Sequence, residues 1–150
     1  MLDIAKGMAY LHSRKVIHRD LKSPNLLLTS APDPSSLTQQ QLASLPCPMV
    51  KITDFGLSRE KPEDGANNLR MTNVAAVAGT PSWMAPELFD PVIEQRRTRA
   101  SFMTITRNYT EAVDTYAFAV VVSELLTCKL PWAGHLLSEL RQAVLIDRSR

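Results

Sequence analysis

The stretch His18-Arg19-Asp20-Leu21-Lys22-Ser23-Pro24-Asn25 is the most informative part of this chain. Two shorter motifs follow it in order, Asp54-Phe55-Gly56 and Ala85-Pro86-Glu87. One tripeptide would mean little in a chain of 150 residues. Coincidence poorly explains three motifs in a fixed order when the longest is intact, so the functional site is expected between residues 18 and 87.

Composition and charge agree with a globular domain and exclude some classes of partner. A hydrophobic content of 45% and a charged content of 21% are typical of a folded chain. The net charge of +2 is too small to indicate nucleic acid or an anionic membrane as a partner. Cys47 and Cys128 match no metal-ligand spacing, so we expect free thiols and a cytoplasmic location. The most apolar run, Ala117 to Leu126, is too short to span a bilayer, although a parent protein attached to a membrane through other segments is compatible with this sequence.

The three motifs resemble those of the protein kinase catalytic domain, whose catalytic loop reads H-R-D-L-x-x-x-N. The form Lys22-Ser23-Pro24-Asn25, with Gly79-Thr80 leading into Trp83-Met84-Ala85-Pro86-Glu87, is similar to the tyrosine-kinase-like group of serine/threonine kinases, which includes mixed-lineage and Raf-type kinases. The resemblance implies an α+β protein kinase-like fold over residues 1–150, a mainly helical large lobe with short β-ribbons.

The small lobe of a kinase is expected to be absent. The sequence contains no G-x-G-x-x-G loop, and only 17 residues precede His18. We therefore expect a large-lobe fragment, whether an excerpt of a longer protein, a truncated gene model or a degenerate copy. Glu87 would then lack the arginine with which the family pairs it, leaving a buried carboxylate without a partner. Ala119 replaces a usual glycine, so some repacking is expected there.

The resemblance assigns catalytic, metal and nucleotide roles to residues of the first two motifs. Asp20 would orient the substrate hydroxyl and accept its proton, and Lys22 would lie beside the transferring phosphoryl group. Asn25 and Asp54 would supply oxygen ligands to Mg²⁺. The implied ATP-binding residues are Lys22, Asn25, Leu27 and Asp54, with Leu27 touching the adenine ring.

Other residues would support these groups. His18 would pack near Phe55 rather than take part in the chemistry, and Asp114 would brace the backbone of the catalytic loop. Arg19 would pair with a phosphate on the activation segment, which runs from residue 54 to residue 87.

Within that segment, the hydroxyl of Thr80 would bond to the catalytic aspartate and lysine. Thr72, in the middle of the segment, is the better phosphorylation candidate, and the alternative is that it is not modified. Glu87 closes the segment.

The hydrophobic pattern predicts the elements around the motifs. We expect a helix over residues 2–13, paired strands at 26–28 and 50–52, a buried helix from Asp114, and an amphipathic stretch over 134–146 with Leu137, Leu140 and Val144 on one stripe. Two inserted loops are expected at about 29–49 and 90–108. The first is interpreted as solvated and disordered. The second carries the basic run Arg96, Arg97, Arg99 and Arg107, for which a solvated face is favoured over an acidic partner.

The sequence thus favours a parent that phosphorylates serine or threonine on protein substrates with ATP and Mg²⁺, the 150-residue chain being inactive alone. One alternative is a pseudokinase-like binding module, but a scaffold has no chemical need for Asp20, Lys22, Asn25 and Asp54. A tyrosine-specific kinase is the weaker alternative, because Lys22 is typical of serine/threonine kinases.

Overall fold

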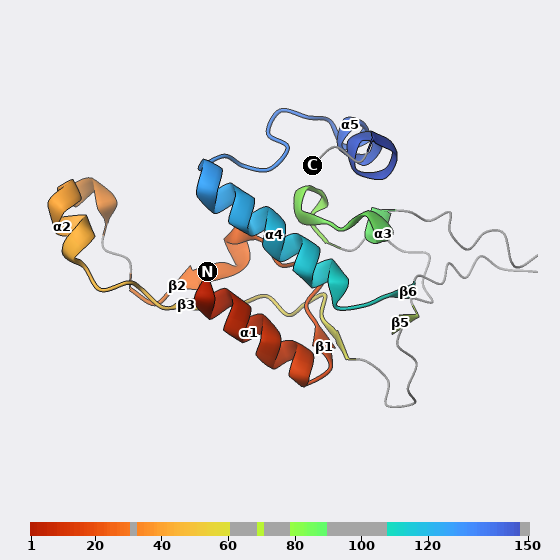
Figure 1. Cartoon of the computed structure of the whole chain (residues 1–150), viewed down its shortest axis with the longest axis horizontal. Coiled ribbons are helices and arrows are strands. Elements are labelled where there is room, and N and C mark those ends of the chain that lie inside the picture. The colour runs from red at the N-terminus through yellow and green to blue at the C-terminus, as the bar shows by residue number, and fades with distance from the viewer. Residues whose placement is uncertain (31–32, 61–68, 71–78, 90–107, 148–150) are drawn as a thin grey trace, which may run out of the picture.

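Helices dominate the described part of the chain, with short strand pairs between them (Figure 1). The computed structural model describes residues 1–30, 33–60, 69–70, 79–89 and 108–147. The α-helices in these ranges are α1 (Leu2–Ser13), α2 (Gln39–Ser44), α3 (Pro86–Phe89), α4 (Ala112–Thr127) and α5 (Leu137–Gln142). The predicted α+β class and the predicted helix over residues 2–13 are confirmed.

Three antiparallel strand pairs connect distant parts of the chain. Strand β1 (Val16–Ile17) pairs with β4 (Arg59–Glu60), and β5 (Leu69–Arg70) pairs with β6 (Asn108–Tyr109). Strand β2 (Leu26–Leu28) pairs with β3 (Val50–Ile52), as predicted. In that register Leu26 lies opposite Ile52, so the residues just before β2 and just after β3 lie together at one end of the ribbon.

Helices α1 and α4 lie side by side and share one hydrophobic core (Figure 1). The spacing of Ile4 and Met8 places both on one face of α1, as expected for residues four apart. They pack against Ala117 and Val121 of α4 and against Leu21 of the catalytic loop. This core ties the loop to the two longest helices.

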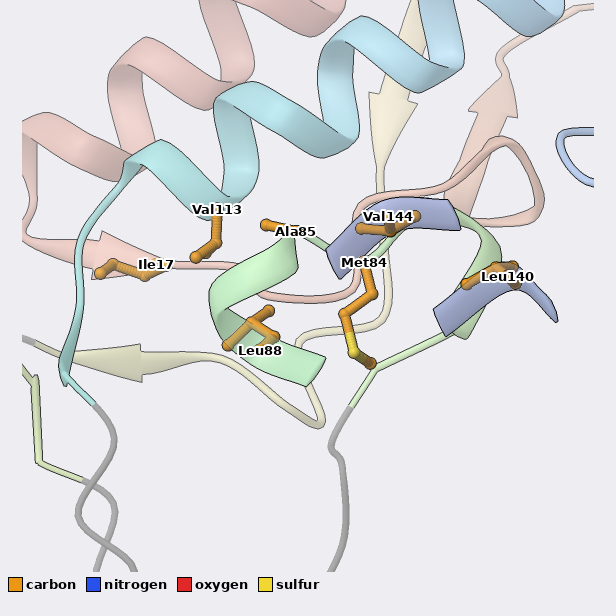
Figure 2. Close-up of a cluster of buried hydrophobic side chains, with 7 residues drawn as sticks. All are labelled: Ile17, Met84, Ala85, Leu88, Val113, Leu140 and Val144. Carbon is orange, nitrogen blue, oxygen red and sulfur yellow. The ribbon is translucent and has the colours of Figure 1, made fainter. Parts of the chain in front are cut away.

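A second core lies under the third motif. Met84 and Ala85 are buried against Ile17 of β1 and Val113 of α4 (Figure 2). Leu88 of α3 lies in the same cluster, together with Leu140 and Val144 from the C-terminal end of the described chain. The core fixes the end of the activation segment next to the start of the catalytic loop.

The prediction that α4 is buried all round is wrong for its C-terminal half. Its buried residues, Val113, Asp114, Ala117 and Val121, form one stripe at helical spacing. Leu125 and Leu126 are 51% and 72% exposed, because no described element covers that end of the helix. The apolar composition of α4 therefore predicted more burial than the helix has in the described structure.

The segment 29–49 is solvated, as predicted, but the interpretation as disordered is wrong. It contains the short helix α2 and the 3₁₀-helix η2 (Pro34–Ser36). Thr38 and Gln41 form reciprocal bonds at the start of α2: the Thr38 amide donates to Oε1 of Gln41 at 2.9 Å, and the Gln41 amide donates to Oγ1 of Thr38 at 3.3 Å. This capping box supplies partners for backbone donors at the helix start.

The predicted stripe over 134–146 is correct in part. Helix α5 begins at Leu137 and continues into a π-helical turn, η4 (Ala143–Asp147), and Leu140 and Val144 are buried. Leu137 is 59% exposed, so it does not belong to the buried stripe.

The insertion predicted at 90–108, with its arginines, lies outside the described residues except for residue 108. Within the described ranges, none of the helices has the length and apolar character needed to cross a bilayer.

Candidate active site

One buried aspartate of α4 holds the start of the catalytic loop (residues 18–25) by hydrogen bonds. Asp114, which is 1% exposed, accepts the backbone N–H of His18 at 2.9 Å and that of Arg19 at 2.8 Å. His12 of α1 brings its Nε2 to 2.9 Å from the same carboxylate. Arg19 has a positive φ of 67°, which turns the chain sharply just before Asp20. The bonds to Asp114 hold that turn in place.

His18 lies beneath the loop and is fully buried. Its ring centroid is 5.2 Å from that of Phe55, and its Nε2 is 3.0 Å from the carbonyl oxygen of Thr53. Its Nδ1 accepts the backbone N–H of Asp20 at 3.3 Å. With both ring nitrogens occupied, His18 links the catalytic loop to the Asp54-Phe55-Gly56 motif, the packing position predicted for it.

Asp20, Lys22 and Thr80 form a closed cluster of hydrogen bonds. Nζ of Lys22 donates to Oδ2 of Asp20 at 2.7 Å and to Oγ1 of Thr80 at 2.6 Å. Oδ1 of Asp20 accepts both the backbone N–H and the hydroxyl of Thr80, each at 2.8 Å. The bonds predicted between Thr80 and these two side chains are therefore present, and they fix the orientation of the carboxylate.

The Asp20 carboxylate is ionised at neutral pH. Burial by itself raises its pKa, but the hydrogen bonds from Lys22 and Thr80 and the nearby ammonium charge outweigh burial and lower the pKa below the ordinary value for aspartate. The stabilisation from these bonds is therefore present above the pKa of an unfolded aspartate and is lost as the pH falls through the lowered value.

Asn25 and Asp54 are brought together by the end of the β2–β3 ribbon. The backbone N–H and the hydroxyl of Thr53 donate to the carbonyl oxygen of Asn25 at 2.9 and 3.2 Å. The amide Nδ2 of Asn25 donates to the backbone oxygen of Asp20 at 2.9 Å, which orients its side-chain carbonyl oxygen.

These two side chains fit Mg²⁺, a hard cation that takes one or two protein oxygens together with phosphate and water. Asp54 has a φ of 63° and is exposed, and its Oδ1 accepts the Gly56 amide at 3.3 Å. The described residues contain no cluster of three or more histidine, cysteine, aspartate or glutamate side chains suited to a metal. A Mg²⁺ ion held by Asn25 and Asp54 would therefore need further oxygen ligands from outside this cluster.

Gly79 allows Thr80 to reach Asp20. Its φ of +124° is one that other residues rarely adopt, and a Cβ there would lie 3.0 Å from the backbone oxygen of Arg19.

We expect Gly79→Ala to destabilise the full-length protein by about 1–3 kcal/mol and to lower phosphoryl transfer, because Thr80 would shift from Asp20. Gly134→Ala is the matched control, since Gly134 also has a positive φ but nothing within 4 Å of the new methyl. Melting curves and transfer rates of both variants test this; an active Gly79→Ala protein would contradict it.

Known families and relatives identify the kind of protein to which this chain belongs. The family model for the protein kinase domain matches residues 1–148. The chain belongs to the protein kinase family. One curated relative is the RGS domain-containing serine/threonine-protein kinase A of Dictyostelium discoideum, 39% identical over 128 residues. Others are the serine/threonine-protein kinase CTR1 of Arabidopsis thaliana, 37% identical over 134 residues, and the mitogen-activated protein kinase kinase kinase 13-B of Xenopus laevis, 37% identical over 131 residues.

These kinases confirm the predicted resemblance to serine/threonine kinases and are consistent with the tyrosine-kinase-like group. The matches cover 85%, 88% and 86% of this chain. The chain in turn spans only 8%, 12% and 10% of the length of those relatives.

The remaining predicted kinase residues have different surroundings. Leu27 is 54% exposed on β2, two residues after Asn25. Arg19 is buried and donates from Nε to the carbonyl oxygen of Leu57 at 2.6 Å, so it lies against the start of the activation segment. Thr72 lies outside the described residues. The phosphate-pairing role of Arg19 stays a prediction.

Two predictions about packing are wrong. Glu87 is half-buried rather than buried, since it lies at the start of the short helix α3, so water can solvate its carboxylate. Ala119 is exposed and lines a pocket of about 330 Å³ that contains none of the predicted site residues. Its methyl group therefore requires no repacking. Tyr116, Val120, Ser123, Pro131 and Trp132 line the rest of that pocket.

Sequence reasoning missed Glu124. This residue stood out only as a charge within an apolar run, yet its carboxylate accepts the hydroxyl of Ser23 at 2.6 Å and the indole N–H of Trp83 at 3.2 Å. A carboxylate on the face of a helix that otherwise looks buried was the only signal available.

Proposed function

We propose that the full-length protein transfers the γ-phosphoryl group of ATP to serine or threonine hydroxyls of protein substrates. The observation that carries this proposal is the Asp20 carboxylate, held by Lys22 at 2.7 Å and by Thr80 at 2.8 Å. An oriented, ionised carboxylate beside a fixed ammonium group suits a reaction that depends on positioning and on charge stabilisation.

Each side chain has one task in this reaction. Asp20 binds the substrate hydroxyl, orients it and accepts its proton, and Lys22 places a positive charge where the transferring group carries negative charge. Asn25 and Asp54 would hold Mg²⁺, which supplies neutralisation of the phosphate charge when bound. Thr80 holds Asp20 and Lys22 in register, and Leu27 offers an apolar contact for the adenine ring.

A non-catalytic, pseudokinase-like binding module is the other candidate. The arrangement argues against it, because a docking surface has no use for Asp20, Lys22 and Thr80 joined by four bonds of 2.6–2.8 Å.

A cytoplasmic location is also proposed. It is supported by Cys47 and Cys128, which are exposed free thiols, the form that a reducing compartment maintains. A protein substrate and ATP are the proposed partners, with no nucleic acid among them.

We expect the full-length protein to label serine and threonine on a generic protein substrate, because Lys22 and Thr80 are typical of the active site of serine/threonine kinases. Phosphoamino-acid analysis of the product, after incubation with labelled Mg-ATP, is the measurement. Phosphotyrosine as the main product would contradict the assignment, and a catalytically dead Asp20 variant supplies the blank.

The 150 residues alone are expected to show no measurable transfer and at most very weak binding of Mg-ATP. They contain no glycine-rich phosphate loop, and Leu27 and Asp54 are exposed, so bound triphosphate would face water. Leu126 and Leu130 are 72% and 63% exposed, which also favours aggregation. Calorimetric titration with Mg-ATP beside a transfer assay decides this, and micromolar binding or clear turnover would overturn it.

A further inference from the structure

The carboxylate of Glu124 joins the catalytic loop to the end of the activation segment. Glu124 lies on α4, and its two oxygens accept different donors: Oε1 accepts the hydroxyl of Ser23 at 2.6 Å, and Oε2 accepts the indole N–H of Trp83 at 3.2 Å. Ser23 begins the 3₁₀-helix η1 (Ser23–Asn25), and Trp83 ends the 3₁₀-helix η3 (Pro81–Trp83). The two donors are 60 positions apart in the sequence and share this one acceptor group.

Both donors are adjacent to the reacting cluster. Ser23 follows Lys22 directly, and the backbone N–H of Trp83 donates to the carbonyl oxygen of Thr80 at 3.1 Å. A displacement of Ser23 would therefore move Lys22, and a displacement of Trp83 would move Thr80. Glu124 bridges the two segments at a point next to the bond between Lys22 and Thr80, which is 2.6 Å long.

Helix α4 thus holds the catalytic loop at two places. Asp114 binds the backbone at His18 and Arg19, and Glu124 binds the side chain of Ser23. The two residues are ten positions apart, about 15 Å along the helix axis, so one rigid element holds the loop near its start and near its end.

The charge of Glu124 strengthens the bridge. Within the described residues no cation lies within ion-pair distance of its carboxylate, so its two neutral donors are its charge-assisted partners. Hydrogen bonds to an ionised acceptor are roughly twice as strong as those between neutral groups. A glutamine would keep one acceptor oxygen and place an N–H₂ group opposite the other donor.

We propose that Glu124 is a positioning residue that sets Lys22 and Thr80 in register with Asp20 through Ser23 and Trp83. This proposal rests on the proposed kinase function. It adds a role for a residue that touches neither the substrate nor the nucleotide.

The kinetic test uses the full-length protein and its Glu124→Ala and Glu124→Gln variants. Loss of the two bonds should lower kcat by about 10-fold in Glu124→Ala, with a smaller loss in Glu124→Gln. KM for ATP should stay within about twofold, because Glu124 bonds to none of the predicted nucleotide residues and a shift of Lys22 should affect the transferring phosphoryl group more than the bound ATP. Ser123→Ala, an exposed change one residue away on α4, is the matched control and should keep the wild-type kcat. In the Glu124→Ala background, Ser23→Ala should add almost no further loss, because its acceptor is gone.

A structural measurement separates this proposal from the kinase assignment. Hydrogen exchange at the Thr80 amide, which donates to Asp20, should become about 10-fold faster in Glu124→Ala and stay unchanged in Ser123→Ala. If the wild-type protein transfers no phosphate, the kinase proposal fails, and the exchange rate alone then decides the role of Glu124. Unchanged kcat in Glu124→Ala, or unchanged exchange at Thr80, would overturn the positioning role.

Discussion

Asp20→Asn in the full-length protein should lower kcat for phosphoryl transfer by at least about 100-fold and leave the affinity for ATP nearly unchanged. The carboxylate accepts two bonds from Thr80 and one from Lys22. An amide has one acceptor oxygen and no negative charge, so it cannot accept the substrate proton or hold Lys22 and Thr80 on two separate oxygens. Because Asp20 itself is predicted to bind neither ATP nor Mg²⁺, ATP binding should survive.

Steady-state rates with a protein substrate, together with direct titration of Mg-ATP, measure both parts of this prediction. Asp54→Asn is the informative comparison, since it should weaken the Mg²⁺-dependent use of nucleotide instead. If both variants turned over at near-normal rates, the roles given to the two aspartates would be wrong.

Asp114→Ala should produce the largest loss of stability, about 3–5 kcal/mol of the free energy of unfolding. The substitution leaves the buried backbone N–H groups of His18 and Arg19 without an acceptor and takes the partner from His12. A loss of that size is a large part of the stability of a typical domain. The turn at Arg19, with its positive φ, would lose the bonds that hold it.

Thermal or denaturant unfolding of the full-length protein is the measurement. Asp33→Ala is the matched control, because Asp33 also accepts two hydrogen bonds, from the amide and the hydroxyl of Ser35, but is exposed. Its melting temperature should be close to that of the wild type. Equal melting temperatures for Asp114→Ala and the wild type would show that the buried carboxylate does not hold the catalytic loop.

The catalytic cluster could be anticipated because its residues stand in motifs that fix both their order and their spacing. Asp20, Lys22 and Asn25 occupy one loop, so their proximity follows from the chain itself. Thr80 is 60 residues from Asp20, and its contact was expected only through the family resemblance. Helix α1 and the β2–β3 ribbon followed from hydrophobic patterns that match a helix and two short strands.

Features that depend on tertiary surroundings were missed. The bridge at Glu124 joins residues 41 and 101 positions away, and no local pattern encodes such contacts. The exposure of Leu125 depends on which elements cover α4, which composition does not report. Helix α2 is different, because Thr38-Gln39-Gln40-Gln41 is a capping-box pattern that outweighed the Ser- and Pro-rich composition of its segment.

The most direct test of the central claim is a paired transfer assay with the full-length protein and its Asp20→Asn variant, purified in parallel. Labelled Mg-ATP and a protein substrate are supplied to both, and phosphoserine and phosphothreonine are measured. The arrangement of Asp20, Lys22 and Thr80 predicts label with the wild type and almost none with the variant. Equal label in both samples, or none in either, would contradict the claim that Asp20 is the centre of a kinase active site.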